Sequence, residues 1–152
     1  MPSGYRRDFV EPNGVSRPKS RMPSSDHRSR GTRRTRVLIA EDDDSLRTLI
    51  RLSVDVGELD IDEAADGETA IVLAHENPPD IALLDWAMPG LTGLDVCRAL
   101  RADPRSANAL IVVVTARVLR GDREQALAAG ADHYLGKPFS PVELLEIVRH
   151  AL

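Results

Sequence analysis

The chain has 152 residues, 42% of them hydrophobic and 29% charged, which is typical of one soluble globular domain. Its formal net charge is −4, and its single cysteine, Cys97, excludes an intramolecular disulfide and a cysteine-pair zinc or redox site. No apolar run approaches the roughly 18 residues of a membrane span, and residues 1–36 lack the apolar stretch of a secretory signal, so we expect a cytoplasmic protein without a membrane span.

The charge is divided unevenly along the chain. Residues 1–36 contain ten Lys and Arg against three Asp and Glu, a balance of +7, whereas residues 37–152 carry −11. The first segment is rich in Arg, Ser, Pro and Gly and has no Leu or Ile, which predicts a disordered basic tail over residues 1–35. Such a tail is either a solvated extension or a weak electrostatic contact for nucleic acid, anionic lipid or an acidic partner.

From Val37 onward, short apolar runs alternate with segments of helical spacing, and turn residues such as Gly57 and Gly130 separate them. Asp44 is the expected N-cap of the first helix, and Ser140-Pro141 is an N-terminal signature for the last. In chain order, the prediction is a strand at 37–40, a helix at 46–56, a strand at 59–62, a helix at 68–76, a strand at 81–84, a helix at 94–100, a strand at 110–114, a helix around 126–128, a strand at 134–135 and a helix at 140–152.

Five strands that alternate with five helices predict an α/β fold, with a parallel sheet covered by helices on both faces. Ligands of such open sheets bind beyond the carboxyl ends of the strands, where the strand order reverses. The candidate functional residues are therefore those that directly follow a strand: Glu41, Asp42 and Asp43, then Asp85, Thr115 and Lys137.

Carboxylates that converge from two strand ends repel one another and require a cation or a proton. An all-oxygen set of ligands favours Mg²⁺, which takes one or two carboxylates and shares its other positions with water and phosphate oxygens. Lys137 supplies a point charge and Thr115 a hydroxyl, both suited to a phosphoryl group. Asp85 is then placed to attack phosphorus and to form an acyl phosphate.

Four groups of residues, in matching order and spacing, resemble the receiver domains of two-component response regulators over residues 36–152. They are Glu41-Asp42-Asp43; Leu84-Asp85-Trp86-Ala87-Met88-Pro89-Gly90 with Thr92-Gly93; Val114-Thr115-Ala116; and Ala129-Gly130-Ala131 leading to Tyr134 and Lys137-Pro138-Phe139. The resemblance implies a doubly wound, flavodoxin-like (βα)5 fold with five parallel strands in the order 2-1-3-4-5. It also implies a cis peptide bond before Pro138.

The resemblance further implies a role for each matching residue. Asp85 would be the phosphoacceptor, and Asp42, Asp85 and the backbone carbonyl of Ala87 would bind Mg²⁺, with Glu41 acting through a metal-bound water. Thr115 and Lys137 would sense the phosphoryl group. Tyr134 would be the aromatic switch, although an aromatic residue in a strand is also explained by packing alone.

The resemblance implies a signalling protein rather than an enzyme, with no catalysis beyond its own phosphorylation and dephosphorylation. A histidine kinase or a histidine phosphotransfer protein would donate the phosphoryl group, and the face of the fourth helix, fifth strand and fifth helix would bind a downstream protein. Because the sequence ends at Leu152, directly after the last helix, we expect a stand-alone receiver.

Three other functions compete with this interpretation. A pseudo-receiver would signal by binding alone, without phosphorylation. A nucleic-acid-binding module would act through residues 1–35 and leave the acidic site idle. A hydrolase that forms an aspartyl phosphate tends to have a second acid two residues after the nucleophile, and that position is Ala87 here.

Overall fold

The computed structural model describes residues 33–117 and 119–152, and the chain from Thr35 to Leu152 forms one compact unit. Residues 1–32, which are most of the predicted disordered basic tail, lie outside the described residues. Within the described part of the chain, no helix is long and apolar enough to cross a membrane.

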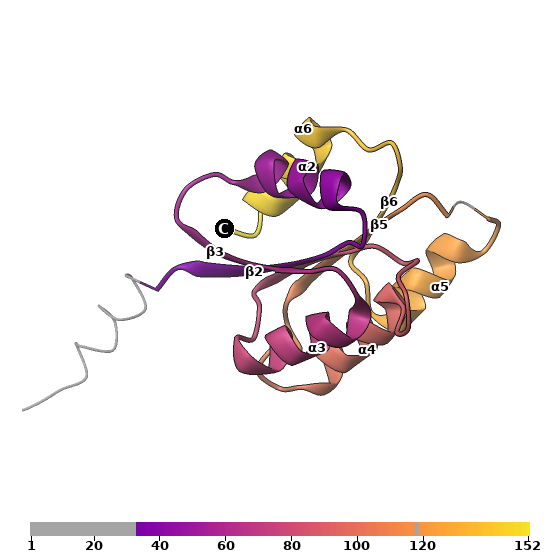
Figure 1. Ribbon diagram of the computed structural model, residues 1–152, viewed down its shortest axis with the longest axis horizontal. Coiled ribbons are helices and arrows are strands. Elements are labelled where there is room, and N and C mark those ends of the chain that lie inside the picture. Colours follow the sequence, from indigo (N-terminus) through magenta and orange to yellow (C-terminus); the bar gives the residue numbers. More distant parts are fainter. Residues whose placement is uncertain (1–32, 118) are drawn as a thin grey trace, which may run out of the picture. The chain divides into compact units, whose positions relative to one another are not determined.

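Five strands and five helices alternate along the described chain (Figure 1). All neighbouring strands pair in parallel, in the order β3-β2-β4-β5-β6. Counted along the chain this is the order 2-1-3-4-5, so the predicted fold class is confirmed. The elements are β2 (Thr35–Ala40), α2 (Asp44–Val54), β3 (Leu59–Ala64), α3 (Gly67–Glu76), β4 (Ile81–Leu84), α4 (Gly93–Ala102), β5 (Leu110–Thr115), α5 (Asp122–Ala129), β6 (His133–Gly136) and α6 (Pro141–Arg149).

The core lies in two layers, one on each face of the sheet. Helices α2 and α6 cover one face, and α3, α4 and α5 cover the other (Figure 1). The central strand β4 is buried along its whole length, which explains its continuous apolar run, whereas in the edge strand β3 only the first and last residues are buried. Each buried side chain on these strands therefore packs under helices.

Short polar side chains fix where several helices begin. Thr92 and Asp95 form a reciprocal capping box at α4, and the Ser140 hydroxyl accepts the Glu143 amide hydrogen at α6. The N-cap of α2 is Asp43, whose carboxylate accepts from the Leu46 amide at 2.9 Å, so the prediction of Asp44 at that position is wrong. Asp44 is instead the first helical residue.

Cys97 is expected to resist thiol reagents until the protein unfolds. Its side chain is fully buried on α4, and its Sγ lies 3.4 Å from the Ala129 carbonyl oxygen. Burial also raises the pKa of the thiol, so little thiolate forms near neutral pH. Labelling with an aromatic disulfide reagent should proceed at the rate of unfolding and accelerate with urea. Fast labelling of the native protein would contradict this prediction.

Candidate functional site

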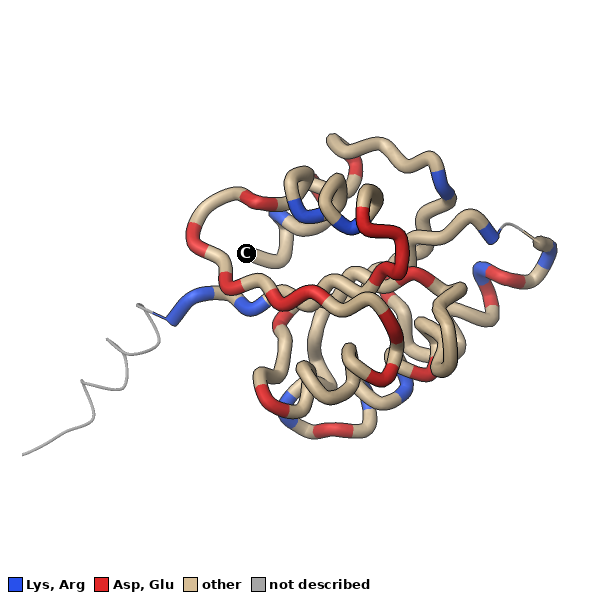
Figure 2. Tube along the Cα trace, in the orientation of Figure 1, with Lys and Arg blue, Asp and Glu red and all other residues tan. Residues whose placement is uncertain are grey.

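The candidate residues gather at the carboxyl edge of the sheet. Strand β2 leads into Glu41, β4 into Asp85 and β6 into Lys137, while Thr115 ends β5. The chain leaves β2 toward β3 on one side and returns to β4 on the other, so the strand order reverses between β2 and β4. The acids therefore lie at the switch point where open α/β sheets bind ligands. Figure 2 shows the loop after β2 as a continuous acidic run.

Three carboxylates meet at this edge. One oxygen from each of Glu41, Asp42 and Asp85 lies within 4.8 Å of the others. Glu41 and Asp85 are buried, at 1% and 5% exposure, whereas Asp42 is exposed. Two carboxylates at this spacing repel by about 3 to 4 kcal/mol at an effective dielectric constant of 20. The cluster therefore favours a cation, and its all-oxygen donors suit Mg²⁺.

Lys137 is the ammonium group in this cluster. Its Nζ lies 2.7 Å from Glu41 Oε1 and 3.2 Å from Asp85 Oδ2, and its side chain is 13% exposed. The backbone amide of Lys137 donates to the Thr115 carbonyl, and the peptide bond before Pro138 is cis, as the resemblance implies. Lys137 thus neutralises part of the acidic charge, and the three carboxylates outnumber it.

Burial and charge shift the pKa values at this site. Burial raises the pKa of Glu41, although its hydrogen bond with Lys137 acts in the opposite direction. Burial alone would lower the pKa of Lys137, but its hydrogen bond to Glu41 and the charge of Asp85 outweigh this and raise it. Lys137 therefore remains an ammonium ion at neutral pH.

The two oxygens of Asp85 have different surroundings. The Ala87 amide donates to Oδ1 at 3.4 Å, and Lys137 contacts Oδ2. Thr115 is buried, and its hydroxyl oxygen accepts the Arg117 amide hydrogen at 3.1 Å. Thus Asp85, Asp42, Glu41 and Lys137 share direct contacts or close spacing, whereas Thr115 borders the group from β5.

Tyr134 belongs to a second group beside the acids. Its ring meets Trp86 edge to face at 6.4 Å, and its hydroxyl donates to the Arg117 carbonyl. The Arg117 guanidinium lies 4.5 Å from the Trp86 ring centre and pairs with the buried Asp122 carboxylate. Trp86 is only 5% exposed, so the group links the residue after Asp85 to the residues beyond Thr115.

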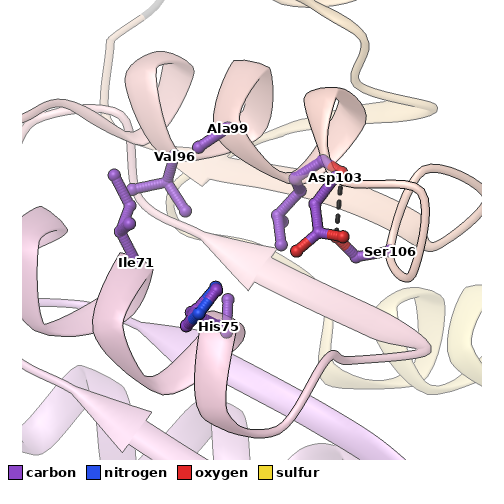
Figure 3. A pocket seen from close by; sticks show the side chains of 8 residues that line it. Ile71, His75, Val96, Ala99, Asp103 and Ser106 are labelled. Carbon is purple, nitrogen blue, oxygen red and sulfur yellow. Dashed lines mark hydrogen bonds between the residues drawn. The ribbon is translucent and has the colours of Figure 1, made fainter.

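A separate cavity of about 110 Å³ lies between α3 and α4 and contains none of the candidate residues (Figure 3). The polar groups around it already have partners: the Ser106 hydroxyl donates to the Leu100 carbonyl at 2.8 Å, and Asp103 and His75 both contact Arg105. Ligand sites place polar groups toward the ligand. The acidic edge is therefore the stronger candidate site.

For two charged residues at this edge, the sequence pattern did not predict the contacts that they make. Arg47 donates from α2 to the Glu41 carbonyl, and Asp122 holds Arg117 over Trp86. Both lie on helices, where a charged residue is normally a solvated one. Their partners here are the Glu41 carbonyl in the loop before α2 and Arg117 in the loop before α5, contacts that no residue pattern marks, so only the fold identifies them.

The chain is similar to known response regulators. The model of the response regulator receiver domain matches residues 37–149. The chain is 35% identical over 117 residues to the phosphate regulon transcriptional regulatory protein PhoB of Rhizobium meliloti, covering 77% of this chain and 52% of PhoB. It is 40% identical over 121 residues to the DNA-binding response regulator MtrA of Mycobacterium tuberculosis, covering 80% and 52%. The chain thus spans about half the length of these relatives.

Solved structures agree with the fold. The chemotaxis response regulator CheY4 of Vibrio cholerae superposes with a TM-score of 0.71 at 27% identity, covering 79% of this chain and all of that chain. The family match begins at the third residue of β2 and runs to the last residue of α6, so it includes the acidic edge. The chain therefore belongs to the response regulator receiver domain family of two-component signalling.

Proposed function

We propose that this domain, in the cytoplasm, accepts a phosphoryl group on Asp85 from the phosphohistidine of a histidine kinase or a histidine phosphotransfer protein. The observation that carries the proposal is the meeting of Asp85 with two further carboxylates and the Lys137 ammonium group at the switch point of the sheet. Receiver domains bind Mg²⁺ at such an acidic pocket, so the family and the donor set favour the same cofactor.

The residues present fit Mg²⁺. Asp42, Asp85 and the backbone carbonyl of Ala87 would hold the ion directly, and Glu41 would act through a bound water. When bound, Mg²⁺ supplies positive charge that offsets the carboxylates and the phosphoryl oxygens. The exposed Asp42 leaves the site open to solvent on one side, which allows both the ion and a phosphodonor to enter.

The transfer uses the chain's own groups in a balanced step. An Asp85 carboxylate oxygen forms a bond to phosphorus as the bond from phosphorus to the donor histidine nitrogen breaks, and that nitrogen retains the electron pair. Lys137 contacts Asp85 Oδ2 and is placed to stabilise charge on the phosphoryl oxygens. Thr115 would donate its hydroxyl hydrogen to one of these oxygens.

Phosphorylation would then alter a protein-binding surface. The modification replaces the carboxylate, of charge −1, with a phosphoryl group of about −1.5 to −2 charge and three oxygens beside Thr115 and Lys137. Tyr134 contacts both Trp86 and Arg117, so a shift at Thr115 or Asp85 reaches β6 through direct contacts. The face of α5, β6 and α6 would present the changed surface to a downstream protein, as a shift between two populations.

Incubation with a small acyl phosphodonor and Mg²⁺ tests the proposal. We expect intact mass analysis to show one base-labile phosphoryl group on the wild type, and none on Asp85→Asn or without Mg²⁺. Asp43→Asn is the matched control, because Asp43 is an exposed acid of the same loop with no proposed ligand role. An adduct on Asp85→Asn would show that Asp85 is not the acceptor.

Absence of an adduct, together with absence of Mg²⁺ binding, would contradict the proposal and favour a pseudo-receiver. The nucleic-acid alternative concerns the predicted tail, residues 1–35, of which 1–32 lie outside the described part. Salt-dependent binding lost on deletion of residues 1–32, which leaves β2 intact, would support it. That the domain acts alone stays a prediction, since the chain spans only about half of relatives such as MtrA.

A further inference from the structure

Arg47 makes a contact with the acidic loop that the proposed function does not use. It lies in the first turn of α2, and its side chain is 18% exposed. Its guanidinium turns back toward the loop, where Nη1 donates to the Glu41 carbonyl oxygen at 2.8 Å. A charged donor fixes such a carbonyl more strongly than a neutral one.

The same guanidinium is held at two further points. Nη2 lies 2.6 Å from Asp44 Oδ1, and Nε lies 3.2 Å from Glu63 Oε1 on the edge strand β3. Glu63 also pairs with Arg51 at 3.2 Å. The planar guanidinium presents its donors in a rigid fork, so these contacts fix its orientation toward the loop.

The Glu41 carbonyl is part of the peptide plane that joins Glu41 to Asp42. Of the two residues that this peptide joins, Glu41 is 1% exposed and Asp42 is exposed, and their carboxylates lie within 4.8 Å of each other. Rotation of that plane would move both carboxylates relative to Asp85. A fixed carbonyl therefore preserves the spacing of the cluster.

We propose that Arg47 is a positioning residue for divalent cation binding at the acidic site. It acts by fixing the peptide between Glu41 and Asp42, and it contacts neither the cation nor the phosphoryl group. The inference rests on the proposed function, because it presumes that the carboxylates bind Mg²⁺.

Electrostatic repulsion alone predicts the opposite change in Mg²⁺ affinity from a positioning role when Arg47 is neutralised, which makes the proposal testable. A guanidinium near the cluster repels a cation, so loss of its charge would strengthen Mg²⁺ binding. Loss of positioning would weaken it, since removal of a residue that orients metal ligands typically costs about 10- to 100-fold in affinity. Weaker binding after neutralisation of Arg47 is therefore a signature of positioning.

The experiment measures the Mg²⁺ dissociation constant of the full chain without a phosphodonor, by titration calorimetry and by the fluorescence of the single tryptophan, Trp86. We expect Arg47→Met to bind Mg²⁺ about tenfold more weakly than the wild type. Arg51→Met is the matched control, because it removes the same charge and a pair with the same Glu63 but does not contact the loop. It should bind Mg²⁺ as tightly as the wild type or slightly more tightly.

Arg47→Lys provides a second test that keeps the charge, and it decides the matter if Arg47→Met does not fold. A lysine has one charged nitrogen in place of the fork, so we expect weaker binding than in the wild type. Wild-type affinity in either folded variant overturns the inference while the proposed function stands. Absence of Mg²⁺ binding by the wild type overturns both.

Discussion

Replacing Gly93 with alanine is expected to lower the stability of the domain by about 2 to 3 kcal/mol and the rate of phosphoryl adduct formation by roughly 100-fold. Gly93 is the first residue of α4, and a Cβ atom there would lie 2.1 Å from the Asp85 carbonyl oxygen and 3.1 Å from Trp86 Cα. The neighbours are backbone atoms at the end of β4, so they yield only if Asp85 moves.

Urea unfolding and the rate of adduct formation measure the two effects. The gain in helix propensity from alanine, about 1 kcal/mol, is smaller than the cost of the overlap. Gly90→Ala, in the loop just before α4, is the control: its φ of 75° strains an alanine by about 1 to 2 kcal/mol, but no atom beyond its chain neighbours lies within 4 Å of its Cβ position. It should lose stability and keep the wild-type rate. An unchanged rate in Gly93→Ala would contradict the prediction.

The positions of Glu41, Asp85 and Lys137 were predictable because they follow from local patterns. Each comes directly after an apolar strand, and parallel strands joined by helices place their carboxyl ends at one edge. The direct contacts of Lys137 with two carboxylates agree with that expectation. The functional roles of these residues stay predictions until phosphorylation and Mg²⁺ binding are measured.

Contacts between distant segments could not be predicted from the sequence. Trp86 is buried because Tyr134 on β6 and Arg117 in the loop after β5 cover it. Strand β2 begins at Thr35, two residues before its apolar run, since Thr35 and Arg36 pair with β3. The hydrophobic pattern does not show whether a polar residue pairs through its backbone, so it could not predict this start of the strand.

The sequence pattern also failed to predict where α6 ends and which residue caps α2. Helix α6 ends at Arg149 instead of the predicted Leu152, and Asp43 rather than Asp44 caps α2. Adjacent acids have the same preference for the N-cap position, so composition alone does not separate them. Here Asp43 accepts the Leu46 amide, while Asp44 pairs with Arg47 within the first turn of the helix.

Arg101→Met is expected to lower the free energy of unfolding by about 3 kcal/mol. The Arg101 guanidinium on α4 donates to the carbonyl oxygens of Ala107, Ala109 and Gly130 at 2.6 to 3.0 Å. It also pairs with Asp132 Oδ2 at 2.9 Å, which in turn accepts the Ile111 amide hydrogen. Methionine keeps much of the apolar stem but leaves these acceptors without their donor, and unsatisfied groups cost more than a lost bond alone.

Arg98→Met on the same helix is the matched control, because Arg98 is exposed and its pair with Asp95 spans 3.5 Å. Its loss should change stability by less than about 1 kcal/mol. The Arg101 contacts lie at the amino ends of β5 and β6, opposite the acidic edge, so folded Arg101→Met should form the phosphoryl adduct at the wild-type rate. Equal unfolding free energies for the two variants would refute the structural role of Arg101, whereas a slowed adduct would show that the two edges of the sheet are coupled.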